Sequence, residues 1–198
     1  LVAMGAGFGV LVVCAIPASS GRVGALERSV FEAINGMPGA LEPFAQAAQY
    51  LGVLAVGPVV AAVAVLARRP RLALAALLAT AGKLLAERAL WEVVQRERPA
   101  QTQPNPIIRG DAATTGLSFV SGHVVLVTSL ALIATAHLRG RWRMLPWLVV
   151  LVVAFARIYL GAHNPLDVVG GIGLGLTVGS AVNLAAGVPH PIDEPARA

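Results

Sequence analysis

Six long apolar segments limit what this chain can fold into. They cover residues 2–18, 46–67, 72–94, 120–138, 144–160 and 165–186 of the 198-residue sequence. Such segments match the ~20 residues with which an α-helix crosses the hydrocarbon of a bilayer. Hydrophobic residues make up 57% of the chain and charged residues only 13%, whereas roughly a quarter of the residues are charged in soluble proteins. The sequence therefore predicts an all-α bundle of six transmembrane helices and excludes a soluble globular domain.

The segment between the first two apolar runs is amphipathic. In residues 24–34 the apolar side chains share one helical face: Leu26, Val30, Phe31 and Ile34. The charged side chains lie elsewhere on the same helix: Glu27, Arg28 and Glu32. This pattern is typical of a helix that lies in the membrane surface. We therefore expect an amphipathic interfacial helix between the first two spans.

Loop charges predict the orientation of the bundle. Two connections carry three arginines each and no acidic residue: Arg68, Arg69 and Arg71, and Arg139, Arg141 and Arg143. Short loops rich in arginine and lysine are retained on the cytoplasmic side, so the other connections should face outward. These two loops carry a charge of +6, against a net charge of +5 for the whole chain, so the basic surplus does not indicate a nucleic-acid partner.

The ends of the chain carry two further expectations. The first apolar segment has neither a starting methionine nor a basic flank. Residues 1–198 are therefore expected to form one membrane domain of a longer protein, with fused or associated domains. Residues 189–198 are polar and rich in proline, so we expect them to form a flexible tail.

Polar residues gather at the ends of three spans that this topology places on the outer side. They form three groups: residues 96–99 after the third span, residues 118–123 at the start of the fourth, and Arg157, His163 and Asp167 around the fifth-to-sixth turn. Guanidinium groups bind phosphate oxygens bidentately, and a helix N-terminus attracts anions. One neutral imidazole can attack phosphorus, a second can protonate the leaving alcohol, and a carboxylate can orient the first ring. The grouping predicts a site that handles phosphate.

Each of these residues also has a simpler structural interpretation. Asn164, Pro165 and Asp167 form a typical helix start, in which Asp167 has only a capping role. Ser121 is compatible with an ordinary helix cap, and His123 with a structural histidine of the bundle. Two fixed spacings with both histidines at one membrane face rarely arise from capping alone, which favours the catalytic interpretation.

The third span carries charged residues of its own. Lys83 with Glu87 and Arg88 with Glu92 are spaced i, i+4, so we expect them to pair inside the bundle or at an interface. By the helical rise, Lys83 lies ~12 Å below Trp91. This depth argues against Lys83 as a simple replacement for a cation at the outer end of the span.

Taken together, the three groups resemble the signature of the type 2 phosphatidic acid phosphatase (PAP2) superfamily, in its membrane lipid phosphatase branch. That signature is Lys-x6-Arg-Pro, then Pro-Ser-Gly-His, then Ser-Arg-x5-His-x3-Asp. The matching residues are Arg98-Pro99, Ser121-Gly122-His123, Arg157, His163 and Asp167. The resemblance implies a phosphoric ester hydrolase of the acid-phosphatase type that needs no metal or other cofactor. It also implies an active site on the extracytoplasmic side of a bacterial-type cytoplasmic membrane.

The resemblance further implies a role for each matching residue. His163 would be the nucleophile that forms a phosphohistidine, Asp167 its orienting partner and His123 the general acid. Phosphate would be bound by the remaining four: Arg98, Arg157, Ser121 and Gly122.

Three positions depart from the signature. Val120 and Ala156 replace a proline and a serine, which removes a rigid turn and a hydrogen bond. Trp91 stands where the family has lysine, which removes a cation from the phosphate site. Either Arg88 or Arg96 is expected to act as an accessory cation in its place. Alternatively, Trp91 lines a lipid groove.

The predicted reaction is hydrolysis of a phosphomonoester or pyrophosphate on a lipid of the polyprenyl or glycerophospholipid type. A lipid phosphate and the bilayer are the expected partners. Two alternatives stay open. The same site could serve a lipid-linked phosphotransferase, or the chain could be a non-catalytic lipid-phosphate-binding domain of a larger protein.

Overall fold

The computed structural model describes residues 1–187, and this part of the chain is helical, with no β-strand beyond one isolated bridge. The α-helices are α1 (Val2–Ala18), α2 (Ala25–Asn35), α3 (Glu42–Gln49), α4 (Val56–Leu66), α5 (Pro70–Trp91), α6 (Pro99–Thr102), α7 (Gly122–Thr135), α8 (Leu145–Tyr159) and α9 (Pro165–Ala185). Three short 3-10 helices connect them: η1 (Gly39–Leu41), η2 (Tyr50–Gly52) and η3 (Gly140–Met144). The expected flexible tail, residues 189–198, lies outside the described residues.

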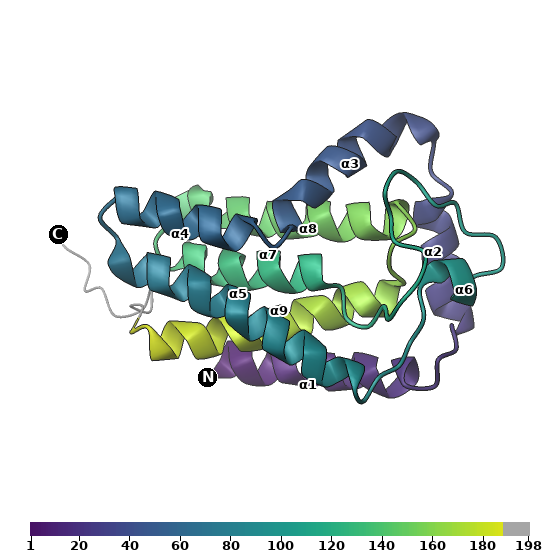
Figure 1. The fold of residues 1–198 in the computed structure, drawn as a ribbon, viewed down its shortest axis with the longest axis horizontal. Helices are drawn as coiled ribbons and strands as arrows, with labels where there is room; N and C mark the ends of the chain where they lie inside the picture. Colours follow the sequence, from purple (N-terminus) through teal and green to yellow (C-terminus); the bar gives the residue numbers. More distant parts are fainter. Residues whose placement is uncertain (188–198) are drawn as a thin grey trace.

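Several of these helices run along the long axis of the molecule. Figure 1 shows α1, α4, α5, α7, α8 and α9 side by side, while α2, α6 and their loops cover one end. Glycines allow α1 and α9 to pack closely, since a Cβ atom added to Gly7 of α1 would lie 2.6 Å from the carbonyl oxygen of Gly173 in α9. Small residues at a helix contact are a common means of packing in membranes.

The second predicted span is not one straight helix. In place of a continuous helix over residues 46–67, α3 and α4 meet at an angle of 63° with a break after η2. The break lets the chain pass closely over the start of α7, because a Cβ atom on Gly52 would lie 2.8 Å from the Cβ of His123. Pro58 fits the first turn of α4, where its missing N–H is not needed.

The six-span count stays a prediction. Among residues 1–187, two helical segments are long enough and apolar enough to cross a bilayer, Gly140–Tyr159 and Pro165–Ala185, and the bent α3–α4 pair would be a third. The apolar helices Val2–Ala18 and Gly122–Thr135 are shorter, with 17 and 14 residues. Helix α5 has 22 residues but carries charged side chains.

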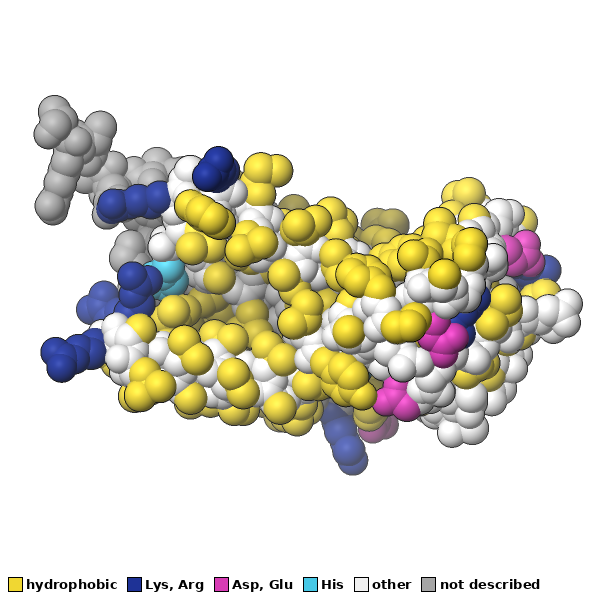
Figure 2. Space-filling model, turned by 90° about the horizontal axis from the view of Figure 1, so that it is seen from above, with side chains coloured by type: hydrophobic (Ala, Val, Ile, Leu, Met, Phe, Trp, Pro, Cys, Tyr) yellow, Lys and Arg dark blue, Asp and Glu magenta, His cyan; other side chains and the backbone are white. Residues whose placement is uncertain are grey.

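The surface has an apolar belt and a basic end. Large apolar side chains are exposed on several helices, among them Val59, Val63, Leu74, Leu85, Leu148 and Leu151. Figure 2 shows hydrophobic side chains along the body of the molecule and Lys and Arg side chains gathered at one end. Five of the six clustered arginines lie in the connections α4–α5 and α7–α8, and the sixth, Arg71, lies in the first turn of α5. A surface of this kind fits hydrocarbon around the middle of the bundle.

Helix α2 forms where the amphipathic pattern predicts it, but its inner face differs from the expected one. The buried residues are Glu27, Phe31 and Asn35, whereas Leu26 is 81% exposed and Val30 is 39% exposed. The two polar side chains face inward because Glu27 bonds to the buried Arg96, and the Asn35 amide donates to the carbonyls of Ile107 and Tyr159. The outward face is therefore partly apolar. Its position in the membrane surface stays a prediction.

Candidate active site

Backbone contacts bring the three predicted groups to one end of the bundle. The N–H of Ser118 donates to the carbonyl of Arg96 at 2.7 Å, which joins the first group to the second. The N–H of Ser121 donates to the carbonyl of Asp167 at 2.9 Å, which joins the second group to the third. The groups therefore meet although up to 71 residues separate Arg96 from Asp167.

A cavity of about 570 Å³ opens where the groups meet. Both candidate histidines and both candidate clamp arginines line it: His123, His163, Arg98 and Arg157. Other polar residues of its wall were not assigned to the site from sequence: Gln49, Tyr50, Lys83, Glu87 and Asp111. Within residues 1–187, no three His, Cys, Asp or Glu side chains are arranged to hold a metal ion. The cavity thus combines imidazole and guanidinium groups at the start of α7.

His163 lies in the turn between α8 and α9, where Gly161 adopts a φ of +77°. The ring is almost fully buried, and its Nδ1 lies 3.0 Å from the carbonyl oxygen of Ser118. Because a carbonyl oxygen only accepts, the neutral ring carries its proton on Nδ1 and keeps a lone pair on Nε2. Burial lowers the pKa of His163 to about 4, although the Asp167 carboxylate opposes the shift. The ring is therefore neutral near pH 7, the form that a nucleophile requires.

Asp167, the third residue of α9, is fully buried. Its Oδ2 accepts from the N–H of Asn164 at 2.8 Å and from the hydroxyl of Ser118. The same oxygen is 3.7 Å from Nδ1 of His163, too long for a hydrogen bond. Asp167 thus reaches the imidazole mainly through Ser118, whose hydroxyl and carbonyl join the two residues. Asp167 also completes a capping box with Asn164, so the capping and orienting interpretations are compatible.

Arg96 does not line the cavity but holds Asp167 on the side away from it. Its guanidinium is fully buried and donates to both carboxylate oxygens of Glu27, at 2.9 and 2.6 Å, and to Oδ1 of Asp167 at 3.2 Å. Glu27 also accepts from the N–H of Leu166 at 3.0 Å. Burial alone would lower the pKa of Arg96, but the two carboxylates outweigh it and raise that pKa. The guanidinium thus has an internal partner, and the expectation that Arg96 replaces the missing lysine has no support in this geometry.

Arg98 and Arg157 are held by neighbouring acceptors and still have donors free. Arg98 donates from Nε to the carbonyl of Thr115 and from Nη1 to the carbonyl of Ala162, each at 2.9 Å. Arg157 donates from Nη1 to the side-chain oxygen of Gln49, and its Nε has no partner in the described part of the chain. Anchored guanidinium groups with remaining donors are suited to bind phosphate oxygens.

Gln49 is a site residue that sequence reasoning missed. It is buried at the end of α3, where its amide oxygen accepts from Arg157 and its amide nitrogen donates to Asp111 at 2.8 Å. A polar amide inside a predicted apolar span was the available signal, since such groups need partners in a membrane. The partners themselves could not be inferred, because they lie 62 and 108 residues away in sequence.

The start of α7 forms one wall of the cavity. Gly122 and His123 line it, whereas Ser121 is fully buried and is not part of the lining. Ser121 stands at the N-cap position of α7 without a side-chain cap bond, and its hydroxyl has no partner among residues 1–187. Binding of phosphate by Ser121 stays a prediction.

The residues that α5 contributes to the cavity differ from the expected ones. Trp91 lines the cavity, and its indole N–H has no hydrogen-bond partner in the described structure. Arg88 is exposed and does not line the cavity. Lys83 and Glu87 form the predicted ion pair, with 2.5 Å between Nζ and Oε2, but both line the cavity. The lysine judged too deep from the helical rise therefore faces the site.

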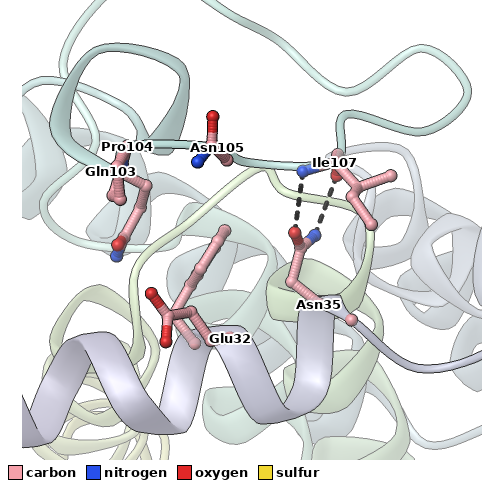
Figure 3. A pocket seen from close by; sticks show the side chains of 8 residues that line it. Glu32, Asn35, Gln103, Pro104, Asn105 and Ile107 are labelled. Atoms are coloured by element: carbon pink, nitrogen blue, oxygen red, sulfur yellow. Dashed lines mark hydrogen bonds between the residues drawn. The ribbon is translucent and has the colours of Figure 1, made fainter.

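A second, smaller hollow lies between α2 and the loop after α6. It has a volume of about 260 Å³, and Figure 3 shows the Asn35 amide bonded to both the N–H and the carbonyl of Ile107 on its wall. Gln103 lines the same hollow and donates to the Asn164 side chain at 2.7 Å. Helix α2 therefore holds the loop that supports the His163 turn.

A comparison with known families identifies this arrangement. The profile of the PAP2 superfamily matches residues 72–187, more than half of the chain and all three motif groups. The chain belongs to the PAP2 superfamily. One related PAP2 protein is the decaprenylphosphoryl-5-phosphoribose phosphatase of Mycobacterium tuberculosis, 42% identical over 98 residues. That match covers 48% of this chain and 50% of the relative, so it spans about half the length of the curated relative.

Solved PAP2-type structures share the fold. LpxE of Aquifex aeolicus superposes with a TM-score of 0.74 at 22% identity, covering 80% of this chain and 95% of that one. A transmembrane PAP2-type phosphatidylglycerolphosphate phosphatase of Bacillus subtilis gives 0.70 at 20% identity, covering 91% and 95%. At these identities the likeness concerns the fold. The apolar helices and the exposed apolar belt of this PAP2 chain are those of an integral membrane protein.

Proposed function

We propose that this protein is a membrane lipid phosphatase that hydrolyses a phosphomonoester or pyrophosphate of a lipid through a phosphohistidine on His163. One observation carries the proposal: two imidazoles and two arginines with free donors line the same cavity. The name of the mycobacterial relative, a phosphatase of a decaprenyl-linked sugar phosphate, supports a lipid-linked substrate of the polyprenyl type. A glycerophospholipid phosphate is the other candidate.

In the first step of the proposed reaction, Nε2 of His163 attacks phosphorus with its lone pair. The bond between phosphorus and the lipid oxygen breaks, and its electron pair stays on that oxygen. His123 then donates a proton to the same oxygen. Arg98 and Arg157 stabilise the charge on the other phosphate oxygens. Asp167 stabilises the imidazolium from 3.7 Å, while the Ser118 carbonyl fixes the ring by accepting from Nδ1.

In the second step water releases the phosphate. His123, now neutral, takes a proton from a water molecule whose oxygen attacks phosphorus. The phosphorus–nitrogen bond breaks, its electron pair returns to Nε2 of His163, and inorganic phosphate leaves. Both histidines regain their starting protonation states, as general acid–base catalysis requires.

We further propose that the site opens on the extracytoplasmic side of a bacterial-type cytoplasmic membrane. Helix α5 begins beside Arg68 and Arg69 and ends at the cavity with Trp91. The arginine-rich loops and the site thus lie at opposite ends of one helix, and such loops are retained in the cytoplasm. Lipid head groups of the outer leaflet would have direct access to the cavity.

The test is phosphate release from short-chain lipid phosphates by the purified chain with EDTA present. We expect release without added metal, its abolition in His163→Ala and a strong reduction in His123→Ala. Full activity of His163→Ala would refute the mechanism. Release only when an acceptor alcohol is added would indicate a phosphotransferase. Binding of lipid phosphate without any release would indicate a non-catalytic domain.

A further inference from the structure

We propose that Lys83 binds the phosphate group of the substrate, as a third cation beside Arg98 and Arg157. The proposal rests on the proposed function, because it assigns a further residue to the same site. It starts from the position of the ammonium group against the first residue of α7.

Lys83 reaches the part of the cavity where a phosphate has the most donors. A Cβ atom added to Gly122 would lie 2.7 Å from both Cε and Nζ of Lys83. The lysine side chain therefore lies against the first turn of α7, whose free N–H groups and helix dipole favour an anion. The next residue, His123, lines the same cavity. A phosphate at this helix start would contact the Lys83 ammonium and the backbone together.

Glu87 keeps Lys83 available in an apolar environment. An unpaired ammonium within a membrane helix is costly, and the partner at 2.5 Å offsets that cost. A lysine ammonium has three donors, so it can keep Glu87 and also donate to a phosphate oxygen. Glu87 also lies within electrostatic reach of Arg98, because its charge opposes the lowering of the pKa of Arg98 by burial. The pair therefore lies among the phosphate-binding groups.

The depth of Lys83 in α5 is consistent with this role. The start of α7 lies level with Lys83 and Glu87, since Gly122 is packed against both side chains. Trp91 lines the same cavity two turns farther along α5. A phosphate bound at Gly122 would thus lie near Lys83, although the lysine of the family signature corresponds to position 91, two turns away. A tryptophan at position 91 is then compatible with a site that keeps three cations.

The test compares Lys83→Met and Lys83→Arg in the full chain, with Arg28→Met as a matched control. Arg28 has the same charge but is exposed on α2, outside the cavity. The measured quantities are the inhibition constant of inorganic phosphate, KM and kcat for a short-chain lipid phosphate. A lost charge-assisted hydrogen bond should raise the inhibition constant and KM by roughly tenfold or more in Lys83→Met. Lys83→Arg should retain most of the affinity, and Arg28→Met should match the wild type.

A double variant separates binding from folding. Lys83→Met alone leaves Glu87 unpaired, whereas Lys83→Met with Glu87→Leu removes the pair as a unit, which buried pairs often tolerate. The double variant should fold and show the same weakened inhibition by phosphate. A wild-type inhibition constant in that variant would overturn the proposal and leave the proposed function standing.

Phosphate binding can also be measured without turnover. Inorganic phosphate should raise the unfolding temperature of the wild type, and Lys83→Met should need roughly tenfold more phosphate for the same shift. If the wild type releases no phosphate from lipids, the proposed function is refuted. The shift in unfolding temperature with phosphate would still show whether Lys83 binds phosphate. Equal shifts in both proteins would refute that role.

Discussion

Glu27→Ala should both destabilise the protein and slow its reaction, although Glu27 lies on α2 and outside the cavity. The carboxylate accepts two hydrogen bonds from Arg96 and one from the N–H of Leu166. Without it, the fully buried guanidinium keeps only its 3.2 Å contact with Asp167. Asp167 would then be drawn toward Arg96, away from the Ser118 hydroxyl that connects it to the imidazole of His163.

The expected loss follows from the burial of this pair. Removing one partner of a buried ion pair costs about 3–5 kcal/mol, because the other charge is left without compensation. At about 2–4 °C per kcal/mol for a chain of this length, the unfolding temperature in detergent should fall by ~6–20 °C. Circular dichroism measures the unfolding, and phosphate release measured well below the transition reports the accompanying fall in kcat.

Glu32→Ala is the matched control. Glu32 lies on the same helix and is exposed, and its side chain has no hydrogen bond or ion pair in the described part of the chain, so the loss of its carboxylate should change stability by no more than ~0.5 kcal/mol. Glu27→Gln, which keeps an acceptor but removes the charge, should lie between the two alanine variants. If the free energies of unfolding of Glu27→Ala and Glu32→Ala differ by less than ~1 kcal/mol, the Glu27–Arg96 pair does not stabilise the site and the reasoning is wrong.

Three further outcomes are expected. His163 has a pKa of about 4 in the folded protein, below the ~6.5 of an unfolded chain. Its contribution to stability is therefore complete above pH ~6.5 and is lost as the pH falls toward 4. The stability of His163→Gln should lack this pH dependence in unfolding curves. Gly173→Ala should cost ~1–3 kcal/mol of stability, because its Cβ would lie 2.7 Å from the carbonyl oxygen of Gly7; an unchanged unfolding midpoint would contradict this packing. Trp91→Lys should leave KM nearly unchanged if Lys83 already supplies the cation, whereas a tenfold decrease in KM would indicate an incomplete site.

The sequence predicts the helices and the convergence of the motifs well, because both depend on local patterns. Five of the six apolar segments have a single main helix within them, and the fixed spacings select His123, His163 and Arg157, which all line the cavity. These signals are carried by residues near one another in the chain. They need no knowledge of distant partners.

The remaining features depend on contacts between distant segments. The break between α3 and α4 arises where Gly52 meets His123, which no local pattern indicates. Arg96 belongs to the internal network because Glu27, 69 residues earlier, pairs with it. Lys83 faces the cavity because of the level at which α7 begins. In each case a spacing along one helix gave no information about the element packed against it.

The contacts of α2 have a consequence for handling the protein. This helix holds Arg96 through Glu27 and the loop at Ile107 through Asn35, while Leu26 is exposed on its outer side. Whatever covers Leu26, lipid or detergent, thus acts on the helix that supports the His163 turn. A detergent that covers α2 poorly should inactivate the enzyme at a temperature at which the bundle is still helical. Solubilisation is then best judged by turnover, since a helical spectrum alone would not reveal this damage.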